Sequence, residues 1–269
     1  MNEESLAIDT TVVIDLETPR TFQDVGGHHH LHLLGISVCG VYFYETDTYR
    51  AFRVEQLPEF EAYLKEHHPV IVGFNHRHFD LPILQPYLHD VKLSALPTID
   101  IMAEIEQVEG FRLKLDTLAQ GTLLEGKSGD GLDAVRYYRR GEWDKLEQYC
   151  LQDVRLTKEL YDYGKMHGKL YYQSNGAPRA VLVSWGGETT VSDLLEQAFK
   201  EHQQVEVTMR IQNEGETSRI TTIADLHAWN PETVRLFSHV TQEELKLPLR
   251  CITHARVLQS QASVQRALF

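Results

Sequence analysis

The stretch Thr11-Val12-Val13-Ile14-Asp15-Leu16-Glu17 combines a hydrophobic run with two carboxylates at its end. A continuous apolar run of this length is typical of a strand buried on both faces, in a sheet that is covered by helices. Side chains alternate along a strand, so Asp15 and Glu17 are expected to leave the same face. Two neighbouring carboxylates repel each other and lose solvation on burial unless a cation joins them. The stretch therefore predicts a buried strand that ends in part of a cation site.

The composition is that of a folded globular protein. The chain has 269 residues, of which 42% are hydrophobic and 24% charged, enough for one large domain or a large and a small one. No apolar run approaches the roughly 20 residues that span a bilayer. Residues 1–5 are acidic and lack the basic start of a signal peptide. Cys39, Cys150 and Cys251 are scattered without CxxC spacing. These features predict a cytoplasmic protein with no membrane contact and no cysteine-based zinc site.

The net charge of -13 argues against broad electrostatic attraction to nucleic acid, which usually needs a basic surface. Residues 1–186 hold 28 of the 39 acidic residues and 18 of the 26 basic ones, a net charge of -10, against -3 for residues 187–269. Most of the net negative charge thus lies in the part that holds the carboxylate motifs. Because bound cations invert the local field of an acidic cleft, the net charge does not exclude a metal-dependent enzyme that acts on nucleic acid.

Apolar runs and helical periodicity alternate after the opening strand. Strands are expected at residues 33–39, 41–52, 69–74 and 98–102. The first two are joined by a tight turn at Gly40 or at residues 45–47 and pair antiparallel with the opening strand. Helices are expected at residues 55–67, 82–88, around 115–119, and 142–165. This order predicts an α/β fold.

The pattern changes near Gly186-Gly187, which is the best candidate for a linker. Short strands are expected just before it, at residues 169–172 and 180–185. After it, Thr190 and Asp193 form a capping-box pattern that opens a helix. Alternating strands follow at residues 205–211, 220–229, 233–237 and 249–258. We therefore expect a large domain over residues 1–186 and a small, mostly-β, barrel-like domain over residues 187–269.

Two local motifs have weak support. Four of the five residues His28-His29-His30-Leu31-His32 are histidines, which ligate transition metals. Adjacent residues do not easily aim several imidazoles at one ion, so a solvated or partly packed loop is expected. Residues 121–128 fit the phosphate-loop pattern GxxxxGK[ST], but that loop needs a strand before it and a helix after it. Here a helix precedes it and Gly129-Asp130-Gly131 follows it, so nucleotide hydrolysis is not expected.

Carboxylates recur in three motifs, each on a different predicted element. They are Asp15-x-Glu17 at the end of a strand, Asn75-x-x-x-Phe79-Asp80 between a strand and a helix, and Tyr149-x-x-x-Asp153 on the long helix. Taken alone, Asp80 fits an ordinary helix N-cap, and Tyr149 with Asp153 fits a surface pair on a helix. Together, and in this order, they resemble the DEDD superfamily of 3′–5′ exonucleases, and the tyrosine resembles its DEDDy branch. The sequences of the first two motifs are most similar to those in the proofreading domains of family B DNA polymerases, and the resemblance covers roughly residues 10–172.

This resemblance implies an RNase H-like mixed sheet flanked by helices and two-metal hydrolysis of a phosphodiester bond. Asp15 would bridge two Mg²⁺ or Mn²⁺ ions, with Glu17, Asp80 and Asp153 completing the two sets of hard oxygen ligands. Tyr149 would orient the attacking water through its hydroxyl. A tyrosine with an ordinary pKa near 10 is a poor base, so the metal ions would acidify the water.

The implied substrate is the 3′ end of nucleic acid, with single-stranded DNA preferred over RNA. Asn75 would fix the strand-to-helix turn or contact the nucleotide, and Phe79 is a further candidate for substrate contact. Pro19-Arg20 follows Glu17-Thr18, where the family often has small residues, so contacts to the terminal nucleotide are expected to differ. The basic cluster with Arg136 and Arg140 either meets the phosphate backbone or is a solvated helix face.

Two alternatives remain open at the level of sequence. The chain is either a nuclease or a non-catalytic nucleic-acid or partner-binding module with a relic exonuclease fold. The C-terminal domain faintly resembles the WYL-type, SH3-like β-barrels that sense ligands or nucleic acid. Dimerisation and substrate clamping are equally open roles for it.

Overall fold

The computed structural model describes residues 9–126, 132–187, 189–213, 216–230 and 232–258. By contacts, the described residues divide into two compact units. Unit one holds the residues up to Leu115 and those from 132 to Tyr161, and unit two holds Asp116–Gly126 and the residues from Asp162 onward. Residues 162–186 thus group with the C-terminal strands by contacts. The assignment of domains to residues 1–186 and 187–269 stays a prediction.

Unit one is built on a five-stranded mixed sheet in the order β3-β2-β1-β4-β5. The strands are β1 (Val12–Glu17), β2 (Val38–Phe43), β3 (Thr48–Phe52), β4 (Ile71–Gly73) and β5 (Thr98–Asp100). β1 pairs antiparallel with β2 and parallel with β4, and β4 pairs parallel with β5. The expected mixed sheet is confirmed, and the opening stretch forms its central strand.

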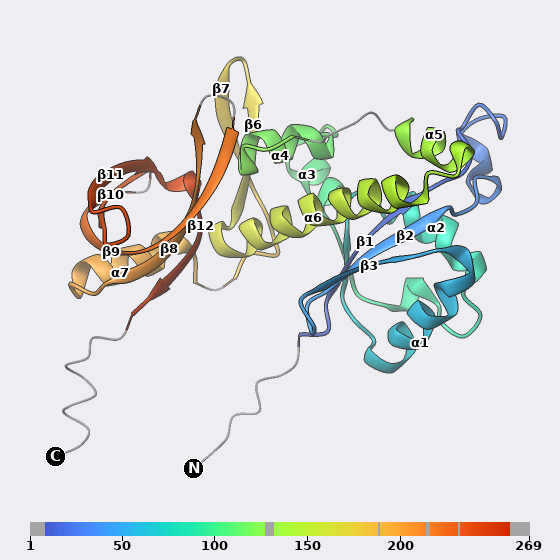
Figure 1. Ribbon diagram of the computed structural model, residues 1–269, viewed down its shortest axis with the longest axis horizontal. Coiled ribbons are helices and arrows are strands. Elements are labelled where there is room, and N and C mark those ends of the chain that lie inside the picture. Colours follow the sequence, from blue (N-terminus) through green and yellow to red (C-terminus); the bar gives the residue numbers. More distant parts are fainter. Residues whose placement is uncertain (1–8, 127–131, 188, 214–215, 231, 259–269) are drawn as a thin grey trace, which may run out of the picture. The chain divides into compact units, whose positions relative to one another are not determined.

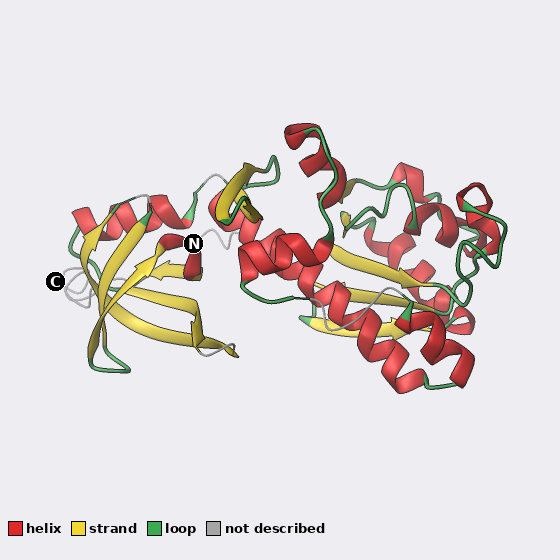
Figure 2. Cartoon of the chain, turned by 90° about the horizontal axis from the view of Figure 1, so that it is seen from above, coloured by secondary structure: helices red, strands yellow, loops and turns green. Residues whose placement is uncertain are grey.

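Helices cover both faces of this sheet, as Figures 1 and 2 show. In unit one they are α1 (Leu57–His67), α2 (Asp80–Leu84), α3 (Ile101–Glu109), α5 (Asp133–Arg140) and the larger part of α6 (Trp143–His167). Short 3₁₀ turns lie at His28–Leu33, Val54–Gln56, Gln85–Tyr87 and Leu93–Ala95. α1 and α2 pack on Val12, Ile14 and Leu16 of β1. Because side chains alternate along a strand, Asp15 and Glu17 point to the opposite face, which α6 covers.

Gly40 lies within β2, where it is paired with Asp15. A Cβ atom at Gly40 would lie 2.8 Å from the Sγ atom of Cys150 and 2.9 Å from a methyl group of Val154. The glycine therefore lets α6 approach the sheet closely. The expected turn at Gly40 is wrong for this reason, whereas the alternative turn at residues 45–47 is confirmed.

Unit two contains a five-stranded antiparallel sheet in the order β11-β10-β9-β8-β12. Its strands are β8 (Val205–Asn213), β9 (Glu216–Trp229), β10 (Thr233–Ser238), β11 (Glu243–Pro248) and β12 (Ile252–Val257), and a 3₁₀ turn lies at Leu249–Cys251. α7 (Val191–Lys200) begins with the expected capping box of Thr190 and Asp193 and buries Val191, Leu195 and Ala198 against the strands. The mostly-β C-terminal module is thus confirmed as an antiparallel sheet. Its resemblance to WYL-type barrels stays a prediction.

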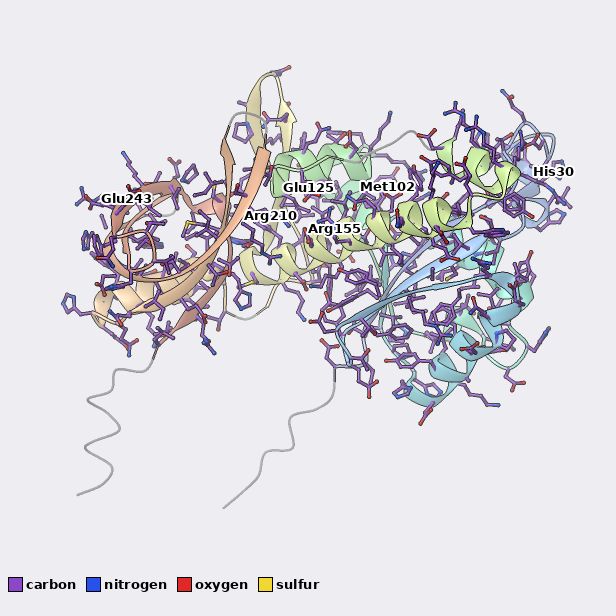
Figure 3. All side chains as sticks on the ribbon, viewed as in Figure 1. His30, Met102, Glu125, Arg155, Arg210 and Glu243 are labelled. Atoms are coloured by element: carbon purple, nitrogen blue, oxygen red, sulfur yellow. The ribbon has the colours of Figure 1, made fainter. Side chains whose placement is uncertain are left out.

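The rest of unit two is α4 (Leu115–Leu123), which begins in unit one, the last turn of α6 and the hairpin of β6 (Lys169–Ser174) and β7 (Ala177–Leu182). The buried Arg210, labelled in Figure 3, donates to the carbonyl oxygen of Leu123 at 3.1 Å. Thr122 exchanges hydrogen bonds with the backbone of Tyr171 at 2.8 and 2.9 Å. These bonds satisfy polar groups that would otherwise be buried without partners.

Several elements differ from the sequence-based expectation: α3, α5 and β11 were not expected, and the strand expected at residues 33–39 begins only at Val38, after the 3₁₀ turn at His28–Leu33. α5 was not expected as a separate helix, because a short, highly charged segment has few apolar positions to show periodicity. The helix expected at residues 82–88 begins at Asp80 and tightens into a 3₁₀ turn after Leu84. Among the described residues, no helix combines the length and apolar character needed to cross a lipid bilayer.

Candidate active site

Three carboxylates converge at the end of β1. One oxygen from each of Asp15, Glu17 and Asp153 lies within 4.8 Å of the others. Asp15 and Glu17 are half-buried on the same face of β1, and Asp153 is 3% exposed on α6. The strand and the helix thus bring together residues that are more than 130 positions apart. Clustered carboxylate oxygens are the ligands that hard divalent cations prefer.

Asp80 lines the same cleft but does not belong to this group of three. It is the first residue of α2, whose N-cap is Phe79, so Asp80 does not act as the N-cap. Instead its Oδ1 atom accepts the backbone N–H of Leu16 at 2.9 Å. Burial raises the pKa of Asp80 to about 7, and the negative charge of Asp100 adds to this, while the Leu16 N–H opposes it. A nearby cation would stabilise the charged form.

Tyr149 lies one helical turn before Asp153 and lines the cleft with it. Its side chain is buried, and its ring meets that of Tyr137 edge-on, with 6.3 Å between the ring centroids. The shared face follows from the spacing of four residues on α6. The structure therefore places the predicted tyrosine and aspartate together.

Cys150 contacts the carboxylate cluster, although no sequence motif marks it. Its Sγ atom lies 3.5 Å from the carbonyl oxygen and 3.8 Å from the Oδ2 atom of Asp15. Burial raises the pKa of this thiol well above its usual value, and the charge of Asp15 adds to the effect. The thiol is therefore protonated and donates toward Asp15. Only the packing of α6 on β1 shows this contact.

The cleft has a volume of about 260 Å³. Besides the four carboxylates and Tyr149, it is lined by residues from the β1–β2 connection, from the β4–α2 turn and from α5. These residues are Leu16, Thr18, Arg20, Thr21, Phe22, Leu34, Phe74, Phe79, Leu132 and Val135. The cleft thus combines an acidic floor with aromatic and aliphatic walls.

The long β1–β2 connection supplies a cation and an aromatic ring to one wall. The guanidinium of Arg20 donates to the carbonyl oxygen of Leu33 at 2.6 Å. The ring of Phe22 lies 3.9 Å from that of His28 and 6.0 Å from that of Phe79, measured between centroids. The sequence marked Arg20 as a departure from the family pattern, but Phe22 had no motif to mark it.

The four candidate substrate contacts fall in different places. Phe79 lines the cleft, whereas Asn75, Arg136 and Arg140 do not. Asn75 lies in the turn after β4 with a φ of 63°, a left-handed conformation that asparagine tolerates. Arg136 and Arg140 are exposed on α5, and Arg136 pairs with Asp133 at 2.6 Å.

The two weak motifs form no site among the described residues. The four histidines lie within the 3₁₀ turn at His28–Leu33 and are exposed, as Figure 3 shows for His30. They do not join another ligand in a metal-binding group within the described part of the chain. Residues 115–123 form a helix where a phosphate loop needs a strand. Lys127 and Ser128 lie outside the described residues.

One comparison with known proteins gave a match. A family model of the RNase H superfamily matches residues 14–164, which contain the three carboxylates of the cluster, Asp80 and Tyr149. No curated protein matches the chain.

Proposed function

Since the chain belongs to the RNase H superfamily, we propose that it is a two-metal-ion 3′–5′ exonuclease that acts on single-stranded DNA ends. Membership points to nuclease-like activity and to a nucleic-acid substrate. The observation that carries the finer proposal is the convergence of Asp15, Glu17 and Asp153 within 4.8 Å, with Asp80 and Tyr149 lining the same cleft.

The donor set fits two Mg²⁺ or Mn²⁺ ions. Carboxylate oxygens dominate the cleft floor, and among the described residues no histidine or cysteine joins the group of three, which favours hard cations over softer transition metals. Asp15, Glu17 and Asp153 would hold the ions together with Asp80. When bound, such ions stabilise the negative charge on the phosphate and lower the pKa of water.

The other residues around the cluster position these groups. The Tyr149 hydroxyl, on the same helix face as Asp153, would orient the attacking water by a hydrogen bond. The Cys150 thiol donates toward Asp15, and the N–H of Leu16 donates to Asp80. Each bond restrains a carboxylate before substrate arrives. Such restraint holds the metal ligands in the geometry that the reaction needs.

The walls of the cleft support a single-stranded substrate. Phe22 and Phe79 line it, and aromatic side chains stack on unpaired bases with little dependence on sequence. Arg20 offers a positive charge for a phosphate. Leu132, the N-cap of α5, lines the cleft, and Arg136 and Arg140 follow it at intervals of four residues, so they share a helix face with it. These arginines would attract the strand as it leaves the cleft.

Oligonucleotides labelled at one end test the proposal. The wild-type protein should shorten single strands from the 3′ end in Mn²⁺ or Mg²⁺ and not in EDTA. Asp15→Asn and Asp153→Asn should each abolish this activity, because they remove a charged ligand with little change in shape. Asp144→Asn is the matched control, since Asp144 is exposed on the first turn of α6.

Three outcomes would contradict the proposal. Cleavage that is unchanged in Asp15→Asn would exclude a role for the cluster, and cleavage from the 5′ end or within the strand would exclude the polarity. An absence of Mn²⁺ binding by calorimetry, with oligonucleotide binding retained, would favour a non-catalytic binding module instead.

A further inference from the structure

Asp100 is a buried carboxylate outside the cleft. It is the last residue of β5, it is fully buried, and it lies beside Gly73 in the parallel pairing of β4 and β5. It does not line the cleft. A buried charge is costly unless several donors satisfy it, so its partners indicate what it does.

Both oxygens of Asp100 accept hydrogen bonds from backbone N–H groups. Oδ1 accepts from Asn75 at 2.8 Å and from Ala103 at 3.2 Å, and Oδ2 accepts from Arg77 at 3.0 Å. The bond from Ala103 caps α3. The other two come from the turn that connects β4 to α2, so Asp100 holds a segment that lies outside the strand pairing of the sheet.

This turn leads directly to Phe79 and Asp80. Asn75 has a φ of 63°, and its carbonyl oxygen accepts the N–H groups of His78 at 3.2 Å and Phe79 at 3.1 Å. The conformation of Asn75 therefore determines where the next residues lie. Because the backbone at Asn75 is in a sparsely populated region, the bond to Asp100 stabilises a conformation that the local sequence does not enforce.

His76 packs against the same carboxylate. Its ring is fully buried, and its Nδ1 atom lies 3.5 Å from the Oδ2 atom of Asp100. Burial lowers the pKa of His76 to about 4, so the imidazole is neutral near pH 7. Its Nδ1 atom makes no hydrogen bond, so the backbone N–H groups are the hydrogen-bond donors that meet the charge of Asp100.

We propose that Asp100 is a positioning residue, which fixes Phe79 and Asp80 in the cleft by holding the backbone of the β4–α2 turn. The inference rests on the proposed function for its effect on catalysis. It does not need that function for its effect on the turn. A competing explanation is that Asp100 only caps α3, as Thr190 caps α7 by accepting the N–H of Asp193.

Two variants separate these explanations. Asp100→Asn retains one oxygen for Asn75 and Ala103 but turns an amide group toward the N–H of Arg77, so the turn loses an acceptor. Ala103→Pro removes only the capping donor, and proline is tolerated in the first turn of a helix. Thr190→Ala is the matched control for the loss of an N-cap side chain in unit two, because the Thr190 hydroxyl accepts the N–H of Asp193.

Asp100→Asn should lower kcat by roughly 10-fold to 100-fold, the range that a displacement of about 1 Å produces. The KM for the oligonucleotide should change less than kcat, since the cleft walls other than Phe79 are unaffected. Amide hydrogen exchange of residues 75–81 should accelerate, and the midpoint of a Mn²⁺ titration should rise. Ala103→Pro and Thr190→Ala should lower the melting temperature without these changes.

The inference is overturned if Asp100→Asn keeps the wild-type kcat and the wild-type exchange rates, or if Ala103→Pro reproduces its effects. If Asp100→Asn does not fold, exchange in the wild-type protein decides, because rapid exchange at Asn75 and Arg77 would exclude the proposed restraint. A wild-type protein without nuclease activity contradicts the proposed function, while exchange and Mn²⁺ binding still test the role of Asp100.

Discussion

The Oδ1 atom of Asp80 accepts the backbone N–H of Leu16 at 2.9 Å. β1 pairs with β4 only at Val12 and Val13, so the paired part of β4 ends before the carboxylates of β1. Asp80 supplies the acceptor that a longer strand would otherwise provide. Because Leu16 stands between Asp15 and Glu17, this one bond brings the second carboxylate motif to the first.

The hydroxyl of Tyr149 is expected to contribute to the chemical step and not to metal binding. Tyr149→Phe should reduce kcat by roughly 10²-fold, the lower end for loss of a group that acts on a proton, with an unchanged Mn²⁺ affinity by calorimetry. Tyr137→Phe is the control, because Tyr137 contacts the Tyr149 ring without lining the cleft. Equal losses in both variants would show that the effect is not specific to the Tyr149 hydroxyl.

Gly40 is expected to set the distance between α6 and the sheet. Gly40→Ala places a methyl group 2.8 Å from the Sγ atom of Cys150, so α6 must shift and carry Tyr149 and Asp153 with it. Overpacking of this kind costs about 1–3 kcal/mol of unfolding free energy, measurable by chemical denaturation, and nuclease activity should fall. Adding Cys150→Ala should restore part of the unfolding free energy and part of the nuclease activity. A double variant with the stability and activity of Gly40→Ala alone would contradict this account.

His167 is expected to destabilise the fold as the pH falls. Burial lowers its pKa to about 4, and its ring Nε2–H donates to the carbonyl oxygen of Ile252 at 2.7 Å. Between pH 6.5 and 4 the unfolded chain therefore binds the proton that the folded chain excludes. The free energy of unfolding therefore decreases by roughly 3 kcal/mol as the pH falls from 6.5 to 4. Above pH 6.5 the proton is absent from both states, and the contribution of His167 to stability is complete.

Urea unfolding at pH 7 and at pH 4.5 measures this effect. His167→Gln should be less stable at pH 7 and should lose less stability on acidification than the wild-type protein. The exposed His254 on β12 provides the control, since His254→Gln should follow the wild-type curve. A parallel loss in His167→Gln would exclude His167 as a source of the acid sensitivity.

Arg140 on α5 is expected to bind phosphate. Arg140→Ala should weaken binding of single-stranded oligonucleotides regardless of sequence, because phosphate contacts carry no base information. The slope of log affinity against log salt should become shallower by about 0.7, since the variant neutralises one phosphate fewer. Arg112→Ala removes an equally exposed arginine that pairs with Glu106 and should leave the slope unchanged. An unchanged slope in Arg140→Ala would instead indicate a solvated helix face.

Several elements were predictable because their signals are local. The apolar run of β1, the capping box at Thr190 and the helical periodicity of α6 are each visible within one element, and the structure confirms them. Gly40 shows what the local sequence cannot predict. A glycine favours a turn by its own conformational freedom, yet here it stands in a strand because a helix from far along the chain packs on it.

The order and spacing of the motifs were enough to select Asp15, Glu17, Asp80, Tyr149 and Asp153 as candidates for the chemistry, because each motif lies within one short segment. How these residues are held became visible only once the elements were packed together. The bond from Leu16 to Asp80, the thiol of Cys150 beside Asp15, the wall with Arg20 and Phe22, and the turn held by Asp100 all join segments distant in the chain. Such contacts depend on packing distances between elements, and one sequence records the alternation of side chains along an element but not the distance to the next one.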